Sequence, residues 1–186
     1  MSENTPDNPS ETDGPGTPTE ASGQEEQHLP PVTIDAQYIK DLSFEAPGAP
    51  SIFQALQTEA PDIQIHVDVR AAKLADNTYE VILVIRAECK AGDKVAFICE
   101  LSYGGLFTLH VPDDALKAVM LIECPRLLFP FARNILADAS RDGGFPPLMI
   151  SPIDFVAMFR EGMKNDQTEN GAQQNELAEE SPAGNA

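Results

Sequence analysis

The chain has 186 residues, of which 42% are hydrophobic, and this is enough for one domain with a real core. Its formal net charge of -18 argues against a nucleic-acid partner, because phosphates need cationic side chains, and favours a basic partner. No apolar run of about 18 residues is present to span a membrane, and the N-terminal residues lack the basic and apolar regions of a secretory signal. We therefore expect a cytoplasmic protein without direct membrane insertion.

Most of the net negative charge lies at the two ends of the chain. Residues 1–35 hold eight acidic residues and no Lys or Arg, and residues 166–186 hold five acidic residues and no base. Neither segment can bury enough apolar surface to offset the entropy lost on ordering. We therefore expect disordered acidic tails at residues 1–34 and 165–186, and one domain at residues 35–164.

The first part of this domain alternates between apolar and polar side chains, which is typical of strands. The predicted strands cover residues 38–45, 62–70, 78–89 and 94–103. Turns at Asp76–Asn77 and at Ala91–Asp93 join the last three into an antiparallel meander. We expect Gly104–Gly105 to interrupt the last strand as a bulge or bend.

Two details of the first strand and its connection affect the later argument. Strict alternation would place Tyr38 and Lys40 on one face of the strand, together with Leu42 and Phe44. Residues 51–61 are expected to form a connection after the strand, since Pro50 cannot continue it. This connection carries apolar side chains that need something to pack on.

From Pro112 onwards the apolar residues recur at helical spacing. Asp113 and Asp114 are suited to cap a long helix, which Pro125 and Pro130 should kink.

Residues 145–150 are expected to form an extended apolar connection. A second helix then begins at a Ser151 cap and runs to about Lys164. Strands followed by helices predict an α+β fold, in which two helices pack on one face of a four-stranded antiparallel sheet.

Motifs for catalysis and metal binding are missing from the sequence. The three histidines have no Cys or acidic residue at ligand spacing, and no nucleophile or phosphate-loop motif occurs. Cys89, Cys99 and Cys124 lie in apolar segments without CxxC spacing, which is typical of buried reduced thiols. We therefore expect no enzyme activity, no metal and no cofactor.

The chain carries more apolar strand, loop and helix than a sheet covered on one face needs. The excess lies in residues 94–109, 52–56 and 145–150 and in the second helix. Three interpretations remain open on pattern alone: all of it is core, it forms a homo-oligomer, or it binds extended apolar polypeptide.

Four blocks in the chain have a recognisable sequence and order. They are DLSFEAP at residues 41–47, AFICE at 96–100 leading to GGLF at 104–107, CPRLLFPFAR at 124–133, and GFPPL at 144–148 with SPIDF at 151–155. These blocks closely resemble SecB, a family of bacterial protein-export chaperones. The resemblance implies a homotetramer, built as a dimer of dimers, that holds unfolded precursor proteins in the cytosol without ATP. It also implies delivery of these precursors to the SecA translocase motor.

The same resemblance implies roles for individual residues. The residues implied in SecA binding are Asp41, Glu45, Ile98 and Glu100. The residues implied at the oligomer interface are Phe97, Cys99, Leu101 and Tyr103. The candidates for client binding are Phe53, Leu56, Phe155 and Phe159. The alternative function is that of an oligomeric adaptor, or a toxin–antitoxin-associated chaperone, for one dedicated client.

Overall fold

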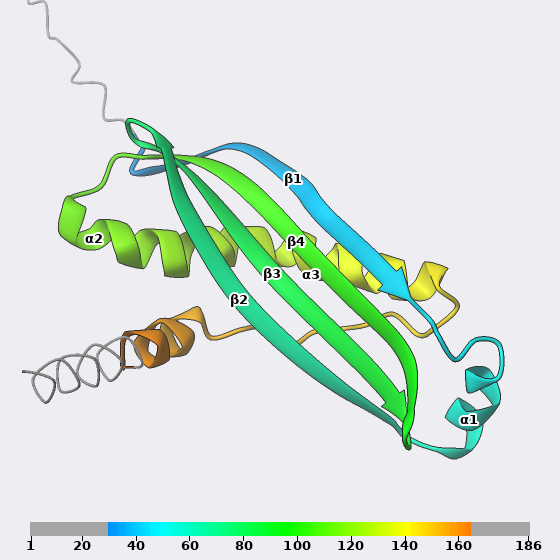
Figure 1. Ribbon diagram of the computed structural model, residues 1–186. Coiled ribbons are helices and arrows are strands. Elements are labelled where there is room, and N and C mark those ends of the chain that lie inside the picture. The colour runs from blue at the N-terminus through cyan, green and yellow to red at the C-terminus, as the bar shows by residue number, and fades with distance from the viewer. Residues whose placement is uncertain (1–29, 165–186) are drawn as a thin grey trace, which may run out of the picture.

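A computed structural model describes residues 30–164, in which helices cover one face of a single antiparallel sheet (Figure 1). The strands are β1 (Val32–Glu45), β2 (Pro61–Ala75), β3 (Thr78–Ala91) and β4 (Lys94–Leu109), in the spatial order β1-β4-β3-β2. The predicted α+β fold is confirmed. β1 begins at Val32, inside the segment assigned from sequence to the N-terminal tail. Residues 1–29 and 165–186, which hold the rest of both predicted tails, lie outside the described residues.

One long helical run crosses the sheet (Figure 1). It consists of α2 (Asp113–Ala118), a π-helical turn η1 (Val119–Glu123) and α3 (Cys124–Asp142), which follow one another without a break. In the π turn the amide of Cys124 donates to the carbonyl of Val119, five residues earlier. The turn ends two residues before Pro125, which has no N–H to offer to the α-helical ladder. The sequence predicted kinks at Pro125 and Pro130. The structure has a change of hydrogen-bond register before Pro125, and α3 continues through Pro130.

Two helical segments differ from the prediction. α1 (Ile52–Thr58) forms within the segment expected to be a plain connection, and it lies at one end of the sheet (Figure 1). The last helix covers residues 155–164. Its cap is Asp154 and not Ser151, since Asp154 Oδ1 accepts from the amides of Val156 and Ala157, both at 3.0 Å.

The core lies between the sheet and α3. Every second residue of β3 and β4 is buried there, together with Cys124, Leu128, Ala132 and Leu136 of α3. The predicted extended segment at 145–150 is anchored to this core by Phe145, Leu148 and Ile150.

All three cysteines are free and buried, as predicted. Burial raises the pKa of the Cys99 thiol to about 11 and that of Cys124 to about 12, so both stay protonated and inert.

A β-bulge at Lys40 changes which side chains of β1 share a face. Ile39 pairs with Tyr103 and Asp41 pairs with Ser102, so Lys40 is an extra residue on β1. The predicted strict alternation is therefore wrong for Tyr38 and Lys40. These two side chains lie on the outer face of the sheet, which we define as the face turned away from α3, whereas Leu42 and Phe44 lie on the inner face.

The glycine pair in β4 does not interrupt the strand, contrary to the prediction. Gly104 and Gly105 keep regular pairing with both neighbouring strands. A Cβ at Gly104 would lie 2.8 Å from the Tyr38 ring, and one at Gly105 would lie 2.5 Å from the Phe107 ring. Glycine is required here because side chains pack directly on the backbone of β4.

Candidate docking and client-binding surfaces

Four of the sequence-predicted residues meet on the outer face of the sheet. Glu45 of β1 pairs with Ile98 of β4, and Ser43 pairs with Glu100. Paired residues of neighbouring strands point to the same face, and the strands lie about 4.8 Å apart. Asp41 lies on the same face, because its partner Ser102 is two residues from Glu100. We call the group Asp41, Glu45, Ile98 and Glu100 the outer acidic surface.

The charges around this surface continue onto β3. Arg86 lies opposite Glu100 and donates a hydrogen bond from Nη1 to Glu100 Oε1. Its Nη2 is 3.8 Å from Glu88, which also pairs with Lys90 at 2.9 Å. The hydrogen bond from Lys90 lowers the pKa of the Glu88 carboxyl. The sequence analysis missed this cluster, although Arg, Glu and Lys alternate there with apolar residues.

A second polar group occupies the other half of the outer face. Glu80 accepts from Lys40 at 2.8 Å and also from the Tyr38 hydroxyl. The Lys40 hydrogen bond, followed by that of Tyr38, lowers the pKa of Glu80. The hydrogen bond between Tyr38 and Glu80 also raises the pKa of Tyr38 to about 12, because the phenol donates to a carboxylate. We call Tyr38, Lys40 and Glu80 the closed triad, since each member already has its partner.

An aromatic cluster forms where α1 meets the end of the sheet. The Phe53 ring lies 5.1 Å from Phe145, which lies 5.0 Å from Phe97 and 6.0 Å from Phe44. Phe53 is the exposed member of the cluster, and Leu56 on the same helix is half-buried. The sequence suggested Phe53 and Leu56 only. The sequence did not predict that Phe44, Phe97 and Phe145 belong to this cluster, because the contact between them depends on how distant segments fold together.

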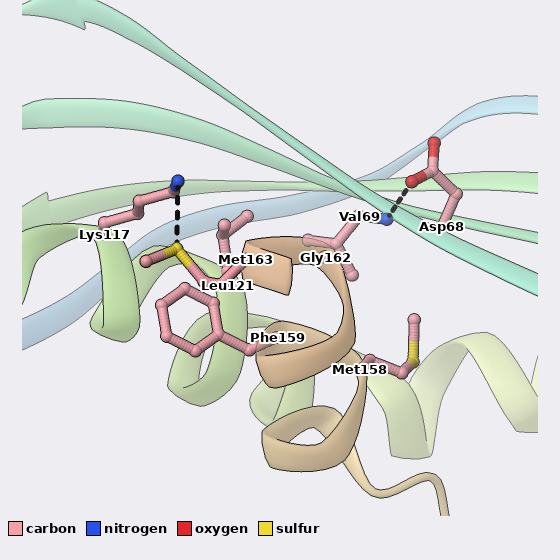
Figure 2. A pocket seen from close by; sticks show the side chains of 8 residues that line it. All are labelled: Asp68, Val69, Lys117, Leu121, Met158, Phe159, Gly162 and Met163. Atoms are coloured by element: carbon pink, nitrogen blue, oxygen red, sulfur yellow. Dashed lines mark hydrogen bonds between the residues drawn. The ribbon is translucent and has the colours of Figure 1, made fainter. Parts of the chain in front are cut away.

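The last helix contributes to a separate cavity of about 170 Å³ (Figure 2). Phe159, Met158 and Met163 from this helix line it with Leu121 of η1 and Val69 of β2. At its rim Lys117 Nζ lies 3.4 Å from the sulfur of Met163 (Figure 2). The cavity walls are mainly apolar side chains, two of them flexible methionines.

Phe155 does not share this exposed position. It is only 1% exposed and packs edge-to-face on Phe129, with ring centroids 6.2 Å apart. In this subunit Phe155 anchors the last helix to α3, and its role as a client contact stays a prediction. The remaining client-binding candidates fall into two places, with Phe53 and Leu56 at α1 and Phe159 at the cavity.

The four residues expected at an oligomer interface are core residues of the subunit. Phe97, Cys99, Leu101 and Tyr103 point from β4 towards α3, and each is buried. Within one subunit they expose little surface, and their predicted role at an oligomer interface stays a prediction.

Large apolar side chains are exposed elsewhere on the subunit. They lie on the edge strands, at Ile34, Tyr38, Ile39 and Leu42 of β1 and Ile63, Ile65 and Leu74 of β2, and on α3 and its neighbouring loop, at Leu127, Phe131 and Met149. Within the segments that the sequence marked as excess, most of residues 94–109 is core, whereas Phe53, Met149 and Met163 are exposed, so the interpretation in which all of that excess is core is wrong. Apolar surface of this extent is typical of proteins that bind other chains.

Features of two other protein classes are missing from residues 30–164. In this range no cluster of three His, Cys, Asp or Glu side chains could hold a metal ion. No helix among these residues is long and apolar enough to cross a membrane.

Comparison with known proteins identifies the family. Residues 25–166 match the family described as preprotein translocase subunit SecB. The protein-export protein SecB of Paramagnetospirillum magneticum is 53% identical over 134 residues, which cover 72% of this chain and 86% of that protein. The protein-export protein SecB of a Bradyrhizobium species is 49% identical over 158 residues, covering 83% and 97% of the two chains.

A solved structure shares the fold. It is a SecB-like chaperone of Mycobacterium tuberculosis in complex with a peptide from an antitoxin, with a TM-score of 0.57, 12% identity, and coverage of 66% of this chain and 91% of that one. The chain therefore belongs to the SecB family of protein-export chaperones, a family of chaperones and not of enzymes.

Proposed function

We propose that this chain acts in the cytoplasm as an ATP-independent chaperone that holds unfolded precursor proteins ready for translocation and delivers them to the SecA motor. Membership of the SecB family supports the chaperone role in protein export. The delivery step is supported by one observation: a single face of the sheet, opposite the helices, holds Asp41, Glu45, Ile98 and Glu100.

The outer acidic surface suits a basic segment of SecA. Its carboxylates attract Lys and Arg side chains, and such complementarity contributes to the association rate and to the choice of partner. Ile98, half-buried between Glu45 and Glu88 of the neighbouring strands, adds an apolar contact within the charged surface. Clients would bind on other parts of the subunit, so delivery would not require the client to leave first.

Unfolded clients would bind to the aromatic cluster at α1 and to the cavity beside the last helix. Phe53 and Leu56 represent the first place, and Phe159 represents the second. Both places are apolar, and neither is shaped for one particular side chain. Many weak apolar contacts spread over separate places favour broad specificity, because no single pocket has to match the client. Met158 and Met163 add to this adaptability, since methionine fills irregular spaces.

Assembly into a homotetramer, a dimer of dimers, would cover the exposed apolar surface. β1 is an edge strand whose outer edge has no partner within residues 30–164, and such an edge can pair with a second copy. The exposed side of α3, with Leu127 and Phe131, offers a second contact surface. Two contact surfaces of different kinds on one subunit support a dimer of dimers.

Calorimetric titration with SecA tests the delivery surface. We expect Asp41→Ala combined with Glu100→Ala to weaken SecA binding about ten-fold or more while binding of an unfolded precursor is unchanged. The matched control is Asp76→Ala combined with Asp114→Ala, which removes the same charge from two exposed sites, at the turn after β2 and in the first turn of α2. Equal SecA affinity for the two double variants would exclude the outer acidic surface as the docking site.

The alternative function, an adaptor for one dedicated client, makes a different prediction. The similar proteins from Paramagnetospirillum and Bradyrhizobium are both named protein-export proteins, which favours the general chaperone. Competition among several unrelated unfolded precursors separates the two. A general chaperone binds them all with comparable affinity, whereas a dedicated adaptor ignores all but one.

A further inference from the structure

Within the described part of the chain, Arg86 is the cation that forms an ion pair with a member of the outer acidic surface. Arg86 of β3 faces Glu100 of β4 across the sheet and is hydrogen-bonded to it. Among residues 30–164, neither Asp41 nor Glu45 has an ion-pair partner. Of the three carboxylates in this surface, Glu100 is therefore the one that a described residue neutralises.

The Arg86–Glu100 pair differs from the closed triad on the same face. In the triad, the Glu80 side chain is 16% exposed and is held by both Lys40 and Tyr38. The side chains of Arg86 and Glu100 are 49% and 40% exposed. Solvent competes for an ion pair at this exposure, so the pair is weak and opens readily. An incoming cation can reach Glu100, whereas the Glu80 carboxylate is less exposed and already accepts from Lys40 and Tyr38.

Arg86 also has a second carboxylate within reach. Its Nη2 lies 3.8 Å from Glu88, whose other contact is Lys90 at 2.9 Å. When Arg86 leaves Glu100, its guanidinium can therefore move to Glu88 without leaving the sheet surface. The alternating charges at positions 86, 88 and 90 of β3 provide this second position.

We propose that Arg86 is an intramolecular competitor of the docking partner: a Lys or Arg side chain of SecA must displace the Arg86 guanidinium from Glu100 in order to bind. This inference rests on the proposed function, because it assumes that the partner binds at the outer acidic surface. Arg86 thereby lowers the affinity of docking and helps the partner to leave once a client has been delivered. A partner must displace Arg86 before it can bind Glu100. Partners without a cation at the matching position cannot do so, and the step therefore adds specificity.

The test is calorimetric titration of SecA against Arg86→Gln at one fixed ionic strength. We expect binding to be about two- to five-fold tighter than for the unaltered protein, the size expected from an exposed ion pair. Arg70→Gln is the matched control. Arg70 lies on the same face and also pairs with a carboxylate, Asp68 at 3.1 Å, but it is opposite Ile82 and not beside Glu100. It should change the affinity less, although the net charge changes equally.

A double variant distinguishes failure of this inference from failure of the proposed function. In a Glu100→Gln background, Arg86→Gln should no longer tighten binding beyond Arg70→Gln, because the carboxylate for which Arg86 competes is gone. If Glu100→Gln weakens SecA binding but Arg86→Gln matches Arg70→Gln or weakens binding, the competitor role is overturned and the docking surface stands. If Glu100→Gln leaves SecA binding unchanged, the docking surface fails and the competitor role fails with it.

Discussion

Tyr38 reaches Glu80 by lying across the bare backbone of β4. The Tyr38 ring occupies the space that a side chain at Gly104 would need, and its hydroxyl donates to Glu80 on the next strand. Lys40, the bulge residue, reaches the same carboxylate. At the scale of single residues, therefore, one glycine and one inserted residue allow β1 to be tied to β3 across β4.

We expect Gly104→Ala to destabilise the protein, because the new Cβ would lie 2.8 Å from two atoms of the Tyr38 ring. The exposed Tyr38 ring would have to swing away and give up its hydrogen bond to Glu80, which costs about 1 kcal/mol in the free energy of unfolding. Gly162→Ala is the control, since no atom lies within 4 Å of its added Cβ. In a helix that change should stabilise by up to about 1 kcal/mol. Urea unfolding at one protein concentration measures both, and equal stability would contradict the close packing.

The titration of Tyr38 tests the closed triad. Its pKa is raised from the ordinary value of 10.0 to about 12, first by the hydrogen bond to Glu80. A raised pKa means that the contact stabilises the fold fully below pH 10, and that this contribution is lost as the pH rises from about 10 to about 12. Glu80→Gln should move the Tyr38 titration towards 10. Ultraviolet absorbance of the phenolate measures it, with Tyr38→Phe identifying the signal, and an unchanged midpoint in Glu80→Gln would contradict the contact.

At the scale of elements, local sequence patterns predicted those strands and helices whose formation depends on local residue spacing. The alternation of β2 and β3 and the helical spacing after Pro112 were sufficient to place those elements. The facing of Tyr38 was not predictable, because the bulge at Lys40 exists only in the pairing with β4. In the same way, Ser151 and Asp154 both fit a capping pattern. Which one caps depends on where the preceding loop is anchored.

The last helix gives a direct test of this point. Asp154→Ala should cost about 1 kcal/mol of helix stability, because two amides lose their acceptor. Asp154→Asn keeps an oxygen in place and should cost less. Ser151→Ala, which alters the cap expected from sequence, should have almost no effect. Hydrogen exchange of the Val156 and Ala157 amides reports the change, and faster exchange in Ser151→Ala alone would restore the original prediction.

At the scale of the whole molecule, the sequence revealed the amount of apolar surface but not what covers it. The resemblance implies an oligomer interface at Phe97, Cys99, Leu101 and Tyr103, and within the subunit these residues are buried, Phe97 against Phe44 and Phe145. Conversely, Ile63 and Ile65 of β2 pair with Cys89 and Ala87, which are buried, and are themselves exposed. A strand pattern shows that one face is apolar, whereas its cover comes from segments far away in the chain or from another copy.

The proposed tetramer can be tested on the exposed side of α3. Phe131 is 52% exposed there, with Leu127 one helical turn away, and contact between two such helices would remove both from water. We expect Phe131→Ser to reduce the mass measured by light scattering from that of a tetramer to that of a dimer, because pairing of the β1 edges is untouched. Leu74→Ser is the control, since Leu74 is 59% exposed at the far edge of the sheet and should leave the mass unchanged. A tetramer that survives Phe131→Ser, or dissociation of Phe131→Ser directly to monomers, would show that α3 does not join the two dimers.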